Sequence, residues 1–150
     1  ATVQANDLRK RAMGRKIVQA MGGDARGKRV AVLGLTFKPN TDDMRDSPAL
    51  AIVQTLLDAG AQVAAYDPEG MDIAAPMMPD VLMTDSAYAA AQGADVVAIV
   101  TEWDAFRALD FARLGESMKA KNLVDLRNIY RREEAERHGF TYCAIGTSAA

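Results

Sequence analysis

The sequence predicts an α/β fold in which helices cover both faces of one doubly wound parallel sheet. Two observations lead to this prediction. Short segments rich in Val, Ile and Ala are mostly apolar without strict alternation, which is the pattern of strands buried on both faces. Segments with a helical pattern lie between them, so strand and helix alternate along the chain.

Six segments have the strand pattern, the third more weakly than the others. Right-handed crossovers through the intervening helices predict a Rossmann-like sheet of six parallel strands in the spatial order 3-2-1-4-5-6. We expect these strands near residues 29–34, 62–67, 80–84, 95–101, 122–126 and 140–145.

Helix boundaries are clearest after the first strand. Ser47 is a typical N-cap residue, Pro48 suits the first helical position, and Gly60 ends the apolar pattern that follows. Weaker patterns predict helices at residues 85–94 and 131–139, a short helix or turn at 102–110, and an irregular loop at 74–79.

The N-terminal segment differs from the rest of the chain. Residues 1–22 predict one basic helix before the first strand, and two glycines end it. We therefore divide the chain into an N-terminal helix at residues 1–24 and one domain at residues 25–150. The partial apolar face of the helix comprises Leu8, Met13, Ile17, Val18 and Met21.

Composition excludes several classes of protein. The chain has 150 residues, is 49% hydrophobic and has a net charge of −2, which describes one globular domain without general affinity for nucleic acid or membranes. Its single cysteine, Cys143, excludes a disulfide framework within the chain, and no cluster of His and Cys indicates a metal site. No apolar run is long enough to span a bilayer. We expect a soluble cytoplasmic protein without a metal.

Candidate ligand-binding residues follow the ends of the predicted strands. In a doubly wound sheet, ligands bind beyond the carboxyl ends of the strands. Lys38 and Arg45 follow the first strand, and Arg127 follows the fifth. Three long cationic side chains on one edge of a mildly acidic protein indicate an anion with several oxygens, and a diphosphate is the simplest choice. The same edge is expected to receive Thr36, Phe37, Asp67, Thr101, Glu102, Trp103 and Asp125.

The loop after the first strand lacks the glycine pattern of a dinucleotide site. Such a site has the pattern GxGxxG after the strand, so that backbone N–H groups meet the pyrophosphate. Here the sequence reads GLTFKP. Asp67 ends the second strand as a ribose-binding acid would, but it follows Gly34 by 33 residues rather than ~20. The sequence therefore predicts that side chains bind the ligand in place of backbone glycines.

Four motifs occur in one order along the chain: GLTFKPNTDDMRDSPAL, YDP, VTEWDAF and DLRNIY. Over residues 28–146 they resemble the C-terminal UDP-binding domain of the UDP-glucose/GDP-mannose dehydrogenase family, and its UDP-glucose 6-dehydrogenases in particular. Residues 1–22 resemble the end of the central helix that joins the two Rossmann-like domains of this family. The resemblance implies a fragment that lacks the N-terminal NAD domain and the catalytic cysteine segment, and that is inactive alone.

The resemblance also implies an activity for the full-length protein. Enzymes of this kind oxidise UDP-glucose twice with NAD and release UDP-glucuronate. The implied partners are these nucleotide sugars, the N-terminal NAD domain of the same protein and, in a homodimer, a second copy. NAD would be bound mainly by the N-terminal domain.

Carried over by motif, the resemblance assigns roles to four residues. It implies that Phe37 and Lys38 contact the nucleotide sugar and that Arg127 meets the UDP part. It implies that Arg45 reaches across an interdomain cleft to NAD. It assigns no catalytic residue and no metal ligand to this chain. The loop with Lys38 and Arg45 would then serve two ligands, which accounts for its length and charge.

Lys38, Arg45 and Arg127 each have a structural alternative, as surface charges paired with nearby carboxylates. The candidate partners of Lys38 and Arg45 are Asp42, Asp43 and Asp46, and those of Arg127 are Asp125 and Glu102. We expect Trp103 in the core rather than stacked on a base.

Two other functions stay open from the sequence. A related dehydrogenase that acts on UDP-N-acetylmannosamine or GDP-mannose is one alternative, because these residues alone do not fix the base and the sugar. A free-standing nucleotide-binding module without enzymatic activity is the other. A GxGxxG domain and a central cysteine segment in the natural gene would favour an enzyme over such a module.

Overall fold

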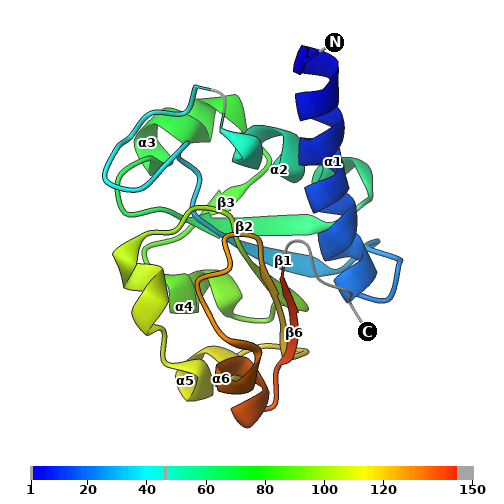
Figure 1. Ribbon diagram of the computed structural model, residues 1–150, viewed down its shortest axis with the longest axis vertical. Coiled ribbons are helices and arrows are strands. Elements are labelled where there is room, and N and C mark those ends of the chain that lie inside the picture. Colours follow the sequence, from blue (N-terminus) through cyan, green and yellow to red (C-terminus); the bar gives the residue numbers. More distant parts are fainter. Residues whose placement is uncertain (1, 46, 145–150) are drawn as a thin grey trace.

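The computed structural model describes the backbone of residues 2–45 and 47–144, and the side chains of this part from residue 8 onward. Six parallel strands form one sheet in the order β3-β2-β1-β4-β5-β6 (Figure 1). The predicted fold class, strand positions and strand order are confirmed. The strands are β1 (Arg29–Leu33), β2 (Gln62–Tyr66), β3 (Leu82–Met83), β4 (Val96–Ile99), β5 (Asn122–Asp125) and β6 (Thr141–Ala144).

Helices cover both faces of the sheet, as Figure 1 shows. One face carries α1 (Thr2–Ala20), α2 (Pro48–Asp58) and α3 (Met71–Ala74), and the other carries α4 (Ala87–Ala91), α5 (Phe111–Glu116) and α6 (Arg132–Arg137). Successive side chains of β1 point to opposite faces of the sheet. Val30 and Val32 belong to one apolar cluster, and Ala31 and Leu33 belong to the other. Burial on both faces explains why the strands are apolar without alternation.

The start of α2 follows from its sequence as predicted. Ser47 is the N-cap residue, and its Oγ accepts a hydrogen bond from the Ala49 N–H (3.2 Å). Pro48 occupies the first helical position, where its missing N–H group costs no hydrogen bond. Ser47 Oγ also donates to the carbonyl of Leu35 (2.5 Å), so the same residue connects this helix to the loop after β1.

Residues 71–77 and 111–116 form helical segments that the sequence did not predict. Residues 74–79 are not an irregular loop throughout, because α3 ends at Ala74 and a 3-10 helix, η1 (Ala75–Met77), follows it. The second segment is α5, which the sequence did not predict and which contains Gly115. A Cβ atom on Gly115 would lie 3.1 Å from Lys121 Cε and 3.2 Å from Phe140 Cε1, so this glycine serves close packing rather than ending a helix. The expected helix or turn at 102–110 is a second 3-10 helix, η2 (Asp104–Ala108).

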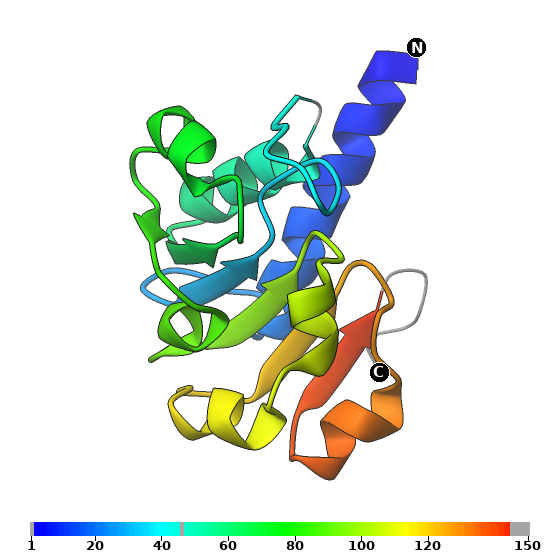
Figure 2. The ribbon, with the colours of Figure 1, turned by 90° about the vertical axis from the view of Figure 1, so that its left-hand side faces the viewer.

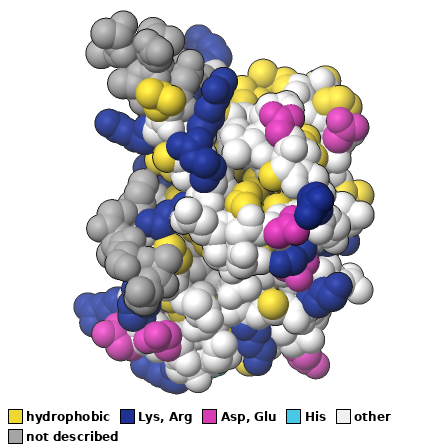
Figure 3. Space-filling view, turned by 90° about the vertical axis from the view of Figure 1, so that its right-hand side faces the viewer, with side chains coloured by type: hydrophobic (Ala, Val, Ile, Leu, Met, Phe, Trp, Pro, Cys, Tyr) yellow, Lys and Arg dark blue, Asp and Glu magenta, His cyan; other side chains and the backbone are white. Residues whose placement is uncertain are grey.

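Helix α1 packs on α2 through a close contact at Gly14. A Cβ atom at Gly14 would lie 2.8 Å from Thr55 Cβ, so the two helices approach more closely than a larger residue would allow. Ile17 and Met21 are buried as expected, but Leu8 is 56% exposed and does not belong to the packed face. Figure 3 shows Lys and Arg side chains gathered on the side of the molecule where α1 lies. The division into a helix at 1–24 and a domain at 25–150 stays a prediction.

The described residues also bear on two expectations, about metal-binding side chains and about membrane-spanning helices. Within the described ranges, no group of His, Cys, Asp and Glu side chains is arranged to hold a metal ion. None of the helices in this part is long and apolar enough to cross a membrane. Cys143 is a buried free thiol on β6, as expected for a small core residue.

Candidate functional site

The carboxyl ends of the strands bring the predicted cationic residues to one edge of the sheet. β4 pairs in parallel with both β1 and β5, so the loops that follow these strands leave the sheet together (Figure 2). We call residues 34–47 the β1 loop and residues 126–131 the β5 loop. The β1 loop carries Lys38 and Arg45, and the β5 loop carries Arg127. The prediction that these three residues share an edge is confirmed.

The β1 loop begins at a residue that must be glycine. Gly34 has a φ angle of 97°, and a Cβ atom on it would lie 2.5 Å from the backbone nitrogen of Thr101. Thr101 follows β4, and its hydroxyl donates a hydrogen bond to the carbonyl of Thr36 (2.8 Å). The β1 loop is therefore packed directly against the end of β4.

The carboxylate of Asp67 lies beneath the same part of the β1 loop. Asp67 follows β2 and is completely buried. Its Oδ2 accepts hydrogen bonds from the backbone N–H groups of Leu35 (2.7 Å) and Thr36 (3.1 Å) and from Nε1 of Trp103 (3.1 Å). Its Oδ1 accepts from the N–H groups of Glu69 (2.9 Å) and Gly70 (2.8 Å). Asp67 thus joins the turn after β2, the β1 loop and the segment after β4.

Phe37 and Lys38 are exposed on a backbone that is fixed beneath them. Phe37 is 48% exposed, and Lys38 is also exposed. The Phe37 N–H donates to the carbonyl of Asp43 (2.8 Å), and the hydroxyl of Thr36 lies 3.0 Å from the carbonyl of Lys38. Between these contacts, Asn40 takes a positive φ of 65°, which reverses the chain. The two side chains are presented to solvent by a closed loop.

Arg45 pairs with a carboxylate two residues away in its own loop. Its Nε and one terminal nitrogen donate to the two carboxylate oxygens of Asp43 (3.1 and 3.0 Å). The hydrogen bonds from Arg45 lower the pKa of Asp43 below its usual range. The Arg45 side chain is nevertheless 89% exposed. Lys38 forms no salt bridge with any residue that the structure describes, and Asp46 lies outside the described residues.

Arg127 has its partner on a different strand end. Its Nε donates to a carboxylate oxygen of Glu102, which follows β4. The Arg127 side chain is 39% exposed and that of Glu102 is 21% exposed. Arg127 thus forms the ion pair that was the alternative to a ligand contact. A ligand phosphate would have to share Arg127 with Glu102 or displace Glu102 from it.

Asp125 fixes the β5 loop from the end of its own strand. It is completely buried, and its oxygens accept hydrogen bonds from the N–H groups of Arg127 (3.2 Å) and Tyr130 (2.9 Å). The Tyr142 hydroxyl lies 2.9 Å from Oδ2 of Asp125 and 2.7 Å from the carbonyl of Tyr130. The Tyr130 hydroxyl donates to the carbonyl of Phe106 and accepts from the Leu109 N–H (3.0 Å).

Two tyrosine hydroxyls of this network have pKa values above the usual range. Burial is the main cause for both residues. It raises the pKa of Tyr130 to about 12. For Tyr142, burial and the hydrogen bond to Asp125 raise the pKa above its usual value. Both hydroxyls therefore stay protonated at neutral pH, where they act as hydrogen-bond donors.

The exposed side chains of this edge are of types that suit a negatively charged ligand. It combines the exposed cations of the β1 and β5 loops with the exposed aromatic ring of Phe37. The only cysteine of the chain, Cys143, is buried within β6 and is not placed as a nucleophile at this edge. The edge therefore offers cations and an aromatic ring, and no cysteine for covalent chemistry.

The role of Asp67 was not predicted. Its position resembled that of a ribose-binding acid but its spacing did not, and the carboxylate is buried and bonded to N–H groups of its own chain. Trp103 is buried as expected, yet its indole nitrogen also donates to Asp67, which the sequence did not indicate. Spacing alone gave no signal for these contacts, because they join residues 31 to 36 positions apart.

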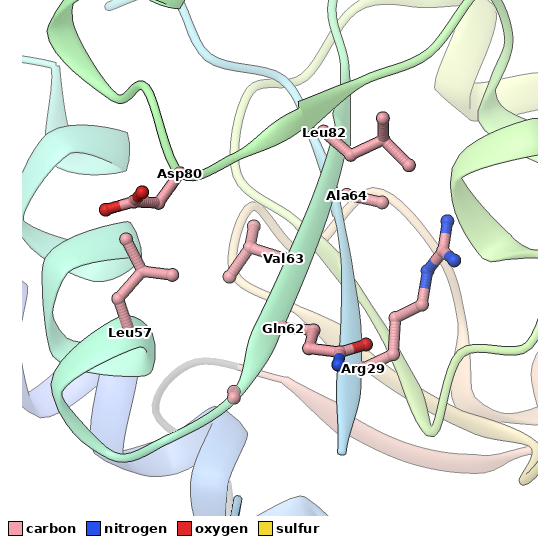
Figure 4. Close-up of a pocket in the computed structure, with 8 residues that line it drawn as sticks. Arg29, Leu57, Gln62, Val63, Ala64, Asp80 and Leu82 are labelled. Carbon is pink, nitrogen blue, oxygen red and sulfur yellow. The ribbon is translucent and has the colours of Figure 1, made fainter. Parts of the chain in front are cut away.

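Two cavities differ in their relation to this edge. One of about 450 Å³ borders the β1 loop and is lined by Asp42, Asp43, Arg45 and four apolar side chains. The other, of about 290 Å³, is shown in Figure 4, where Leu57, Val63 and Asp80 surround it near the start of β2. The second cavity is remote from the predicted cationic residues, so only the first adjoins the candidate site.

Comparison with known proteins shows the family of this chain. Residues 31–132 match the UDP binding domain of the UDP-glucose/GDP-mannose dehydrogenase family. The chain is 61% identical over 145 residues to the UDP-glucose 6-dehydrogenase of Rhizobium meliloti (strain 1021), and the match covers 97% of this chain and 33% of that protein. The chain thus spans about a third of the length of the relatives it matches.

Solved structures with the same fold include two dehydrogenases of UDP-sugars. A UDP-glucose dehydrogenase from Pyrobaculum islandicum superimposes with a TM-score of 0.75 and 29% identity, covering 93% of this chain and 30% of that one. A UDP-D-ManNAc dehydrogenase from Pyrococcus horikoshii gives a TM-score of 0.73 and 28% identity, covering 96% and 31%. The fold of this chain is therefore similar to one part of each of these longer proteins.

Proposed function

Because the chain belongs to the UDP-glucose/GDP-mannose dehydrogenase family and matches its UDP-binding domain, we propose that it binds the UDP part of UDP-glucose in an NAD-dependent UDP-glucose 6-dehydrogenase. The observation that carries the proposal is the span of the family match, residues 31–132, which includes all the predicted ligand residues. The 61% identity to a UDP-glucose 6-dehydrogenase favours UDP-glucose over UDP-N-acetylmannosamine and GDP-mannose.

The proposed contacts follow the two loops. Arg127 meets the UDP phosphates, where its guanidinium exchanges the carboxylate of Glu102 for phosphate oxygens. Phe37 and Lys38 contact the nucleotide sugar from the closed β1 loop. Their exposure supports this role, because a ligand can reach both side chains without any change in the core.

The β1 loop does not fit a dinucleotide held in the usual way. The N–H groups of Leu35 and Thr36, which would face a pyrophosphate, donate to Asp67 instead. We therefore place the main NAD site in another part of the full-length protein, with Arg45 as a contact from this chain. The 89% exposure of the Arg45 side chain supports a contact to a group outside the domain.

The length of the relatives supports a division of the full-length protein into more than one domain. The relatives are about three times as long as this chain. We propose that residues 1–24 are the end of a helix that connects residues 25–150 to an N-terminal NAD domain, and that two full-length copies form a homodimer. This chain then contributes binding energy that positions the sugar for two hydride transfers, and the nucleophilic chemistry belongs elsewhere.

Calorimetric titration of the natural full-length protein with UDP and with NAD tests the assignment. Arg127→Ala should weaken UDP binding by about 1.5 to 3 kcal/mol, the range for hydrogen bonds to a charged group, and should leave NAD affinity nearly unchanged. Arg45→Ala should weaken NAD binding and spare UDP. Equal losses of both ligands in both variants would mean that the two arginines stabilise the loops rather than contact separate ligands.

The chain offers a matched control for Arg45. Arg26 lies before β1, at the opposite edge of the sheet, and donates to both carboxylate oxygens of Asp24 two residues away (3.2 Å each). This geometry is nearly that of Arg45 with Asp43. Arg26→Ala should therefore change neither UDP nor NAD affinity. Titration with UDP-N-acetylmannosamine and GDP-mannose separates the related substrates, and no binding of any nucleotide sugar would refute the proposal.

A further inference from the structure

The backbone N–H groups that follow β1 donate to Asp67. In doubly wound sheets that bind dinucleotides, the N–H groups that follow the first strand point at a pyrophosphate. Here the corresponding groups of Leu35 and Thr36 point at a buried carboxylate from the end of β2. A permanent anion of the chain itself thus satisfies the donors that would otherwise bind a ligand anion.

Asp67 has no capacity left for an external ligand. Five N–H groups of the chain donate to its two oxygens, and its exposure is 0%. Any effect of Asp67 on a ligand must therefore pass through the loop that it holds. This distinguishes Asp67 from Lys38 and Arg127, whose exposed side chains can touch a ligand directly.

The contacts of Thr36 connect Asp67 to the ligand-binding side chains. The Thr36 N–H donates to Asp67, its carbonyl accepts from the Thr101 hydroxyl, and its own hydroxyl lies 3.0 Å from the carbonyl of Lys38. The turn after β2 packs closely against Thr36, since a Cβ atom on Gly70 would lie 2.4 Å from Thr36 Cγ2. These contacts hold the peptide groups before Phe37 in place.

We propose that Asp67 is a positioning residue, which fixes the backbone of residues 35 and 36 and thereby sets where Phe37 and Lys38 meet the nucleotide sugar. This inference rests on the proposed UDP-sugar binding. It also accounts for the use of side chains in this site, because the backbone donors after β1 are already bonded to the carboxylate. The ligand is then recognised on the solvent-exposed side of the β1 loop, by the side chains of Phe37 and Lys38.

Asp67→Asn is the test variant, measured in the natural full-length protein with UDP-glucose in the absence of NAD. Asparagine keeps the size of the side chain but replaces one acceptor oxygen by an amide that donates, so one pair of backbone N–H groups loses its acceptor. We expect the dissociation constant for UDP-glucose to rise about tenfold or more. The matched control is Asp95→Asn, since Asp95 also accepts a backbone N–H, from Arg29 at the opposite edge (2.9 Å), and should leave the affinity unchanged.

A double-mutant comparison separates positioning from general damage. Lys38→Ala should weaken binding less in the Asp67→Asn background than in the unsubstituted protein, because Lys38 is already misplaced there. Arg127→Ala should weaken binding by the same factor in both backgrounds. Additive effects with both residues, or an unchanged dissociation constant in Asp67→Asn, would overturn the inference.

Two further measurements keep the test decisive. If Asp67→Asn does not fold, Trp103→Phe removes one donor to Asp67 while keeping an aromatic ring, and should raise the dissociation constant about two- to fivefold; no change would count against the inference. If the unsubstituted protein does not bind UDP-glucose, the proposed function fails, and amide hydrogen exchange then decides the role of Asp67. Asp67→Asn should speed exchange at Leu35 and Thr36 but not at Arg127, and equal rates at all three would overturn the inference.

Discussion

The β1 loop and the β5 loop both present a cation at the carboxyl edge of the sheet, but different parts of the molecule hold them. The β1 loop depends on neighbouring strand ends, since Asp67 follows β2 and Thr101 follows β4. The β5 loop depends on Asp125 at the end of its own strand, together with Tyr142 of β6. The first loop is therefore held by residues that follow β2 and β4, on either side of β1, and the second by β5 itself and the edge strand β6.

The arginines of the two loops also differ, in their ion-pair partners and in their exposure. Arg45 pairs with Asp43 inside its own loop, and its side chain is 89% exposed. Arg127 pairs with Glu102 on another strand end and is 39% exposed. A loop whose backbone is anchored by buried residues does not need its charged side chains for its own shape. Both loops donate backbone N–H groups to a buried aspartate, and the β5 loop adds contacts of its own side chains, from Arg127 to Glu102 and from Tyr130 to Phe106.

The largest expected effect is that of Gly34→Ala. The new methyl group would meet the backbone of Thr101 at 2.5 Å, and the positive φ angle disfavours alanine as well. We expect a loss of about 3 kcal/mol or more in the free energy of unfolding, measured by urea denaturation. Gly93→Ala is the control, because Gly93 also has a positive φ but no atom within 4 Å of a built Cβ. It should lose only about 1 kcal/mol, and equal losses would show that the approach to Thr101 is not important.

Alkaline pH should reveal the dependence of the β5 loop on Tyr130. The folded chain holds the Tyr130 proton up to about pH 12, whereas the unfolded chain releases it near pH 10. Between these values the folded state binds more protons than the unfolded state, so the stability falls as pH rises. The contribution of Tyr130 is fully present below pH 10, and we expect up to about 2 kcal/mol to be lost by pH 12.

Tyr130→Phe provides the control for this pH dependence. The variant lacks the titrating hydroxyl, so its free energy of unfolding should fall less steeply above pH 10 than that of the unsubstituted chain. Urea denaturation at pH 9, 10 and 11 measures both slopes. Identical slopes in the two proteins would indicate that the Tyr130 hydroxyl is not the group that limits alkaline stability.

The smallest expected effects concern the two ion pairs. Glu102→Gln should cost about 1 kcal/mol or less in the free energy of unfolding, because the pair with Arg127 is partly exposed but joins two strand ends. Asp43→Asn should leave this free energy nearly unchanged, since its pair with Arg45 is confined to one exposed loop. Thermal unfolding of both variants at neutral pH checks the order, and a larger loss for Asp43→Asn would reverse our account of the two loops.

The sheet was predictable because its signals are local. Strands buried on both faces have continuous apolar segments, and Ser47 with Pro48 marks a helix start within a few residues. The helix α5 was missed because Gly115 ordinarily indicates a helix end, and only the packing of Phe140 and Lys121 against it explains its presence. Leu8 was expected on a packed face of α1 and is exposed.

The candidate site was predictable in part. The placement of Lys38, Arg45 and Arg127 at one edge followed from parallel strands, because the carboxyl ends of such strands meet. The internal role of Asp67 did not follow, since periodicity shows which residues are buried but not which N–H groups a buried carboxylate accepts. The ligand contacts of Phe37, Lys38, Arg45 and Arg127 stay predictions.

Because β3 is short, a further strand can pair with this edge of the sheet over only a few residues. This outermost strand comprises Leu82 and Met83, which pair with Ala64 and Ala65 of β2. Pro79, just before it, has no N–H group to offer an incoming strand. A foreign strand arriving at this border would find too few free backbone groups for a stable ladder, although Leu82 is 56% exposed there. The border at β3 therefore opposes edge-to-edge aggregation of the domain at high concentration.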